Sequence, residues 1–211
     1  MQEFSYALLE DDSYAVMKYE GDEAVVTIPE EYGSRKVTLL NDELFKGHPE
    51  LEEVILPETL RTIGSFCFDG CVRLKGISLP RSLTEIWQYA FARSGIEVID
   101  LPGSLVSIPP YALKGCANLT MAVLHPGTRR ICGHAFEDCG NLKMVAVHKD
   151  TEVRHDAFAG CDQLDPKLRL SFTATCKCPK CAPAGARIDV HGLLKKKAGQ
   201  PQQELPKADP Q

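Results

Sequence analysis

The sequence lacks the features by which many functional classes are identified. Its 211 residues contain no apolar run near the roughly 18 residues that a membrane helix needs. The GxSxG, P-loop, GxGxxG and HExxH signatures are absent, so no catalytic or dinucleotide site is predicted. The first residues show no basic segment followed by an apolar stretch, so no secretory signal is predicted. We expect a non-enzymatic cytoplasmic protein that does not enter a membrane. A cell-surface or secreted location is the alternative, if a leader has been removed.

Cysteine is plentiful, but its placement does not favour disulfides. The chain has nine cysteines, an odd number without a pairing pattern. Six of them fall within a sequence repeat, at positions that are expected to face its interior: Cys67, Cys71, Cys116, Cys132, Cys139 and Cys161. A buried thiol behaves as a compact apolar side chain. We therefore predict buried, reduced cysteines, as in a reducing compartment.

Charge is distributed unevenly along the chain. Residues 1–170 contain 17 Lys and Arg against 26 Asp and Glu, whereas residues 171–211 contain 7 against 3. An acidic body does not favour nucleic acid as the partner of the main part of the chain. The simplest interpretation of the basic C-terminal part is that it contributes solubility.

Four columns of similar residues recur every 22 or 23 residues between Leu40 and Leu164. The first column is aliphatic: Leu40, Ile63, Ile86, Ile108, Ile131 and Val153. The second is mostly phenylalanine: Phe45, Phe68, Phe91, Leu113, Phe136 and Phe158. The third is mostly cysteine, and the fourth is Leu51, Leu74, Ile96, Leu119, Leu142 and Leu164. A period of this length is typical of a solenoid, in which stacked coils bury an interior that no single unit can bury alone.

Each unit contains one short predicted strand. In Leu51–Leu56 the apolar residues of the inward side alternate with outward-facing ones. Three successive strands end at a proline, which cannot continue the ladder: Pro57, Pro80 and Pro102. The second half of the unit, which carries the phenylalanine column, is expected to be either a one-turn helix or irregular coil.

The chain divides into three parts. Residues 1–39 contain β-prone runs separated by turn residues, and we predict an antiparallel cap that covers the open end of the solenoid. Residues 40–170 carry the repeats. Residues 171–211 contain a cysteine cluster followed by sequence rich in Gln, Pro and charge. Such a composition cannot bury enough apolar surface to fold, so disorder is predicted there.

The repeat pattern resembles that of the BspA-like leucine-rich repeat family. The residues that carry the resemblance are Leu83-Thr84-Glu85-Ile86 with Ala90-Phe91, Ile108 with Ala112-Leu113-Lys114-Gly115-Cys116, and Ile131 with Ala135-Phe136. The resemblance implies an α/β, predominantly β, right-handed leucine-rich repeat solenoid of about six coils. It further implies a protein that binds other macromolecules and has no catalytic residues. Members of this family are often secreted or displayed on cell surfaces.

The outward side of the later strands is the first candidate site. Its apolar members are expected to lie side by side, with two histidines at the rim where earlier units have proline: Met121, Val123, Met144, Ala146, His125 and His148. Exposed apolar surface often marks a contact site, and methionine adapts to varied partners. We predict a site for another protein, whose identity the sequence does not give. Coverage by the tail or by a second copy of the chain, surface without a role, and a histidine metal site or pH switch are the alternatives.

Cys176-x-Cys178-x-x-Cys181 is the only cluster with metal-ligand spacing. Zinc needs four ligands, so His191, Cys161 or another chain would have to complete such a site. Incidental or redox-active thiols are the alternative interpretation, and no other cofactor is predicted. Two functional hypotheses result: a protein–protein interaction module, or a metal-binding or redox-responsive regulator that uses this cluster with the repeats as scaffold.

Overall fold

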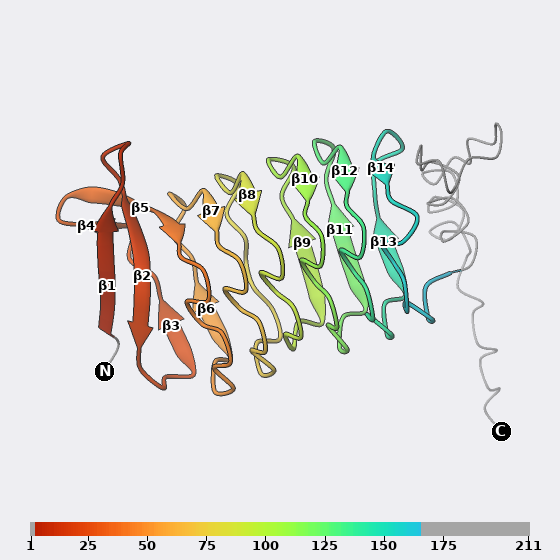
Figure 1. Cartoon of the computed structure of the whole chain (residues 1–211), viewed down its shortest axis with the longest axis horizontal. Helices are drawn as coiled ribbons and strands as arrows, with labels where there is room; N and C mark the ends of the chain where they lie inside the picture. Colours follow the sequence, from red (N-terminus) through yellow and green to blue (C-terminus); the bar gives the residue numbers. More distant parts are fainter. Residues whose placement is uncertain (1–2, 166–211) are drawn as a thin grey trace, which may run out of the picture.

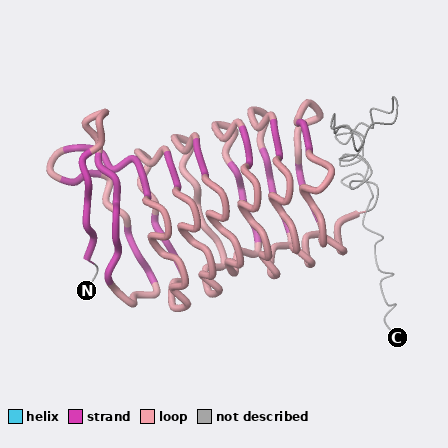
Figure 2. The backbone as a smooth tube through the Cα atoms, viewed as in Figure 1, coloured by secondary structure: helices cyan, strands magenta, loops and turns pink. Residues whose placement is uncertain are grey.

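A computed structural model describes residues 3–165 of the chain as a row of stacked coils with a strand-rich N-terminal end (Figure 1). These residues form 14 short strands joined by turns (Figure 2). The predicted solenoid is confirmed. Its expected helical component is not found within residues 3–165, which accordingly contain no helix that could cross a membrane. The segments that carry the phenylalanine column are irregular turns.

The N-terminal end begins with an antiparallel hairpin and then changes to parallel pairing. Strand β1 (Glu3–Leu8) pairs with β2 (Tyr14–Glu20) in antiparallel fashion. Strand β2 then lies parallel to β5 (Arg35–Leu40). The short strand β4 (Glu31–Tyr32) pairs in antiparallel fashion with the first residues of β5. The transition to parallel pairing starts the solenoid, because all later ladders are parallel.

The coils contribute two lines of short parallel strands. The first line, along the upper part of Figure 1, consists of β5, β7 (Thr62–Ile63), β8 (Glu85–Ile86), β10 (Ser107–Ile108), β12 (Arg130–Ile131) and β14 (Glu152–Val153). The second consists of β3 (Val25–Thr27), β6 (Glu53–Ile55), β9 (Val98–Leu101), β11 (Met121–Leu124) and β13 (Met144–Ala146). Register pairs Ile63 with Ile86 and Ile108 with Ile131, so the aliphatic column is confirmed at these steps.

The first line is interrupted between β8 and β10 because Pro109 has no N–H. At the equivalent position in four other coils, the backbone N–H bonds to the carbonyl of the aliphatic residue one coil earlier. These bonds measure 2.8 to 3.0 Å and join Gly64 to Leu40, Trp87 to Ile63, Cys132 to Ile108 and Arg154 to Ile131. Proline cannot donate the corresponding bond to Ile86. The ladder between Ile86 and Ile108 therefore does not form, although both side chains remain buried.

The turns that carry the phenylalanine column form a third ladder between coils. The N–H of Phe45 donates to the carbonyl of Cys67 at 2.8 Å, and the N–H of Phe68 donates to Ala90 at 2.7 Å. The residues that flank this column have φ between 53° and 77°: Glu43, Phe66, Tyr89, Tyr111 and His134 before it, and Gly47, Gly70, Arg93, Gly115, Asp138 and Gly160 after it. This left-handed backbone explains the glycines, because glycine adopts it without strain.

Stacked phenylalanine rings form the centre of the core. The ring centroids of Phe68 lie 5.4 Å from those of both Phe45 and Phe91, and the planes of Phe68 and Phe91 differ by 2°. Phe136 and Phe158 stack at 5.1 Å, and the fully buried Leu113 occupies the same column between Phe91 and Phe136. The predicted spine of the solenoid is therefore present.

Removing one ring of this spine should weaken the whole stack. Phe91→Ala is expected to lower the free energy of unfolding by about 3–5 kcal/mol through loss of burial and the cavity left behind. It should also split or broaden the thermal transition, because a solenoid is held by contacts between neighbouring coils. Calorimetry and chemical denaturation measure both effects. Trp87→Ala removes an aromatic ring that is 53% exposed, and should change the stability by only about 0.5 kcal/mol. A single, unshifted transition in Phe91→Ala would contradict the assignment.

Candidate functional site

The sheet formed by β9, β11 and β13 brings the predicted contact residues together. Parallel register places Met121 between Val98 and Met144. One pleat further along, Val123 lies between Asp100 and Ala146. The alternate residues of the three strands point inward, and Ile99, Ala122 and Val145 are fully buried. The outward positions of this sheet therefore form one continuous surface.

This surface is apolar and accessible. Met144 is 42% exposed and Val98 is 44% exposed, whereas Met121, Val123 and Ala146 are half-buried. We call these five residues the apolar patch. Val98 was not among the residues predicted from the sequence, which were taken only from the later units. The register of β9 with β11 is what adds it to the patch.

The two histidines at the rim do not form a common site. The Nε2 atom of His125 lies 2.7 Å from an Oδ1 atom of Asp100 in the preceding coil. The backbone N–H of Asp150 instead donates to Nδ1 of His148 at 3.4 Å. Each imidazole thus has its own partner. Within residues 3–165 no group of three or more His, Cys, Asp or Glu side chains is arranged to hold a metal ion.

An open groove lies on the other side of β9 and was not predicted from the sequence. It has a volume of about 530 Å³ and lies between β6 and the segment Lys75–Leu79, which forms no strand. The acidic groove, as we call it, is lined chiefly by Glu52, Glu53, Ile55, Leu56, Glu58 and Ile77. A second hollow of about 440 Å³ continues from it towards Asp100 and His125. The sequence feature that could have indicated this groove is Gly76, because a glycine inside a strand weakens the strand.

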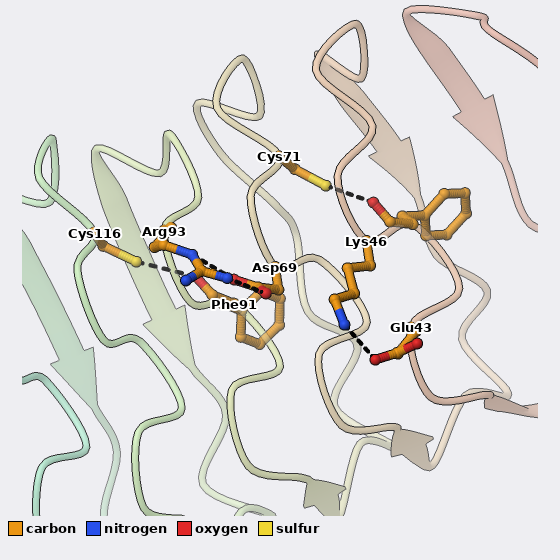
Figure 3. Close-up of polar contacts among 8 residues, drawn as sticks. Glu43, Lys46, Asp69, Cys71, Phe91, Arg93 and Cys116 are labelled. Atoms are coloured by element: carbon orange, nitrogen blue, oxygen red, sulfur yellow. Dashed lines mark hydrogen bonds and ion pairs between the residues drawn. The ribbon is translucent and has the colours of Figure 1, made fainter.

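The recurring cysteines are structural donors in the interior. The Sγ of Cys71 donates to the carbonyl of Phe45 at 3.1 Å, and that of Cys116 donates to the carbonyl of Phe91 at 3.1 Å (Figure 3). Cys139 and Cys161 make the same bond to Leu113 and Phe136. Five of the six cysteines in the described part are fully buried and none is in a disulfide. The prediction of buried thiols is confirmed for these five positions and is wrong for Cys132, which is half-buried.

Burial also makes the thiols of Cys67 and Cys71 poor nucleophiles. It raises the pKa of the Cys71 thiol to about 12, and it raises the pKa of Cys67 as well. Because the thiolate is the nucleophile and the metal ligand, a thiol that stays protonated at neutral pH is a poor candidate for either role. Cys176, Cys178, Cys181 and His191 lie outside the described residues. The Cys161 thiol, considered as a fourth zinc ligand, is fully buried and donates to a backbone carbonyl.

Polar pairs connect neighbouring coils at the turns. Asp69 is buried, and its carboxylate accepts two bonds from the Arg93 guanidinium one coil later, at 3.1 and 2.5 Å (Figure 3). In the same region Lys46 pairs with Glu43 within a single turn (Figure 3). Arg93 occupies a left-handed position that most coils give to glycine. We interpret these pairs as structural, because each is satisfied within the stack.

The comparisons with known proteins agree with this geometry. A model of the BspA type leucine rich repeat region matches residues 38–165 in six copies, so the chain belongs to this family. No curated protein matches the sequence. A leucine-rich repeat protein of T. pallidum is similar in structure, with a TM-score of 0.67 and 27% identity over 82% of this chain and 92% of that one.

Two further solved structures share the fold. A leucine-rich repeat protein from Bacteroides ovatus is 25% identical, with a TM-score of 0.56, over 78% of this chain and 51% of that one. A leucine rich cell surface protein from Faecalibacterium prausnitzii is 22% identical, with a TM-score of 0.59, over 76% and 46%. The chain thus spans about half the length of these two proteins. The latter likeness concerns the fold alone.

The inaccessibility of the buried thiols can be measured directly. In the native protein at mildly alkaline pH, iodoacetamide should leave Cys67, Cys71, Cys116, Cys139 and Cys161 unmodified, because they are buried and their reaction requires an accessible thiolate. The half-buried Cys132 should react faster than all of them. Peptide mapping by mass spectrometry distinguishes the sites, and a sample in denaturant should be modified at every cysteine. Fast labelling of Cys71 in the folded protein would show that the interior is open.

Proposed function

We propose that this member of the BspA-type leucine-rich repeat family is a non-enzymatic scaffold that binds another protein through the apolar patch. Leucine-rich repeats of this family supply surface for protein interactions. The observation that supports the particular site is the row Val98, Met121 and Met144, which places three large apolar side chains side by side on one sheet.

The chemistry of the patch favours a partner with an apolar contact surface. The patch has no charged residue except at its edge, where Asp100 is already bonded to His125. Burying apolar area contributes about 25 cal/mol per Å², and a methionine side chain can adjust to the shape of what it meets. The backbone beneath is held by parallel pairing on both sides of β11, so the surface is pre-formed and little ordering is required on binding.

A double substitution in the patch should abolish partner binding without unfolding the protein. In Met121→Glu/Met144→Glu, two carboxylates would have to be desolvated at the interface, and capture of the partner from a lysate of the source cell should fall by at least about tenfold. The matched control is Val72→Glu/Val106→Glu, which changes two exposed valines elsewhere. It should capture the partner normally.

Two measurements distinguish the possible outcomes. Circular dichroism of both variants should match that of the unchanged chain, because none of the four side chains is buried. Sedimentation then tests for a second copy of the chain on the patch: a dimer that the methionine variant dissociates would show that the partner is the chain itself. Undiminished capture by the methionine variant would reject the site.

A further inference from the structure

One coil interrupts the second line of strands. Residues Gly76–Leu79 form no backbone hydrogen bond to either neighbouring coil, and only the carbonyl of Lys75 accepts a bond, from the N–H of Glu97 at 2.9 Å. The edge of β6 that faces this coil is therefore unpaired. Gly76 has no side chain to fill the space, and a Cβ added there would meet no atom within 4 Å. These features create the acidic groove.

The groove combines an apolar floor with an acidic rim. Ile55 is 48% exposed, and Leu56 and Ile77 pack against the core while remaining partly accessible. Glu53 and Glu58 stand at the rim and form no ion pair within residues 3–165. An occupant that matches this lining therefore needs apolar side chains and several positive charges close together in the sequence.

We propose that the acidic groove docks the segment Leu193–Lys197 of this same chain. This segment consists of two leucines followed by three lysines, so it offers two apolar side chains for the floor and three cations for the rim. It lies outside the described residues. The charge of the two parts is complementary, because residues 1–170 carry an excess of acidic groups and residues 171–211 an excess of basic ones.

The connection is long enough for docking within one chain. Twenty-seven residues separate Asp165, the last described residue, from Leu193. At about 3.3 Å per residue they can span up to about 90 Å. The groove lies five coil spacings from Asp165, or roughly 24 Å at about 4.8 Å per spacing. A tethered segment is present at an effective concentration in the millimolar range, so a contact that would be weak between separate molecules is populated.

The apolar patch is a poorer docking site for this segment. Among the outward residues of β9, β11 and β13 the only carboxylate is that of Asp100, which is already bonded to His125. The patch therefore offers three lysines fewer partners than Glu53 and Glu58 do. Exposed ion pairs are individually weak and are screened by salt. The docking is therefore reversible, and it depends on the apolar floor and on the acidic rim acting together.

Zero-length crosslinking of the full chain tests the proposal. A carbodiimide joins a lysine amine to a carboxylate that it contacts, and mass spectrometry then identifies the linked peptides. At low protein concentration, Lys195, Lys196 or Lys197 should be linked to Glu53 or Glu58 within a single chain. The yield should fall by about tenfold in about 1 M salt, where the Debye length is only about 3 Å.

Matched charge reversals provide the controls. Glu53→Lys/Glu58→Lys also removes the carboxylates that would be crosslinked, so amide exchange is measured instead: the amide hydrogens of Gly76–Leu79 should exchange faster in this variant. Glu10→Lys/Glu85→Lys makes the same change in net charge at exposed positions away from the groove and should leave that exchange unchanged. A second variant leaves the sequence of the solenoid unaltered and changes only the docking segment: Lys195→Glu/Lys196→Glu/Lys197→Glu. In this variant the amide hydrogens of Gly76–Leu79 should exchange faster than in the unchanged chain.

Three results would overturn the proposal. The first is that the three lysines are linked to Glu10 and Glu85 as often as to Glu53 and Glu58. The second is that the links are found only between the two chains of a dimer. The third is that the amide hydrogens of Gly76–Leu79 exchange at the same rate with and without the three lysines. The dimer result would assign the groove to a second copy of the chain. None of these measurements requires a partner protein, so their outcome is independent of the function proposed for the apolar patch.

Discussion

Hydrogen bonds between the backbones of successive coils are the constraint on which this structure depends. A coil of 22 or 23 residues pairs only some of its N–H and carbonyl groups within itself, as in the bond from the N–H of His48 to the carbonyl of Phe45. Buried groups left unpaired are costly, so the remaining groups need partners in the neighbouring coils. At the turns, residues with left-handed backbone lie on both sides of the phenylalanine column. This conformation lets alternate N–H groups of the turn donate to backbone carbonyls of the next coil. The same demand accounts for Gly47 and Gly70, which adopt the conformation, and for Cys71 and Cys116, whose thiols supply an extra donor to a carbonyl.

The part of the fold that follows from side-chain periodicity could be predicted from the sequence. The aliphatic and phenylalanine columns recur in six units, and each column corresponds to one row of buried side chains in the structure. The interruptions could not be predicted in this way. Pro109 and Gly76 each interrupt a ladder through the backbone: Pro109 lacks an N–H, and Gly76 weakens a strand. The buried columns nevertheless keep the same types of side chain at these two coils, so the interruptions do not show in the pattern. A pattern of side chains reports what is buried, but not which backbone donor meets which acceptor.

The two candidate surfaces also differ in how far side-chain periodicity predicts them. The apolar patch was predictable in outline because outward residues of equivalent strands must lie beside one another, and Met121 and Met144 are such a pair. The inclusion of Val98 and the separation of His125 from His148 depend on register and on individual carboxylates, which periodicity does not specify. The acidic groove was missed for a further reason. It exists because one coil departs from the repeat, whereas a repeat is recognised by what its units share.

The arrangement of the two surfaces has a consequence for how they would act together. The hollow that continues from the acidic groove is lined by Asp100 and His125, and Asp100 lies in register with Val123 of the apolar patch. A segment in the groove that extends by a few residues in this direction therefore covers the nearest edge of the patch. On the two proposals together, docking of the basic segment and binding of a partner protein compete for adjoining surface. A tethered competitor lowers the apparent affinity of the partner by the fraction of time for which the patch is free. Salt, which weakens the acidic groove but not an apolar contact, then shifts the balance towards the partner.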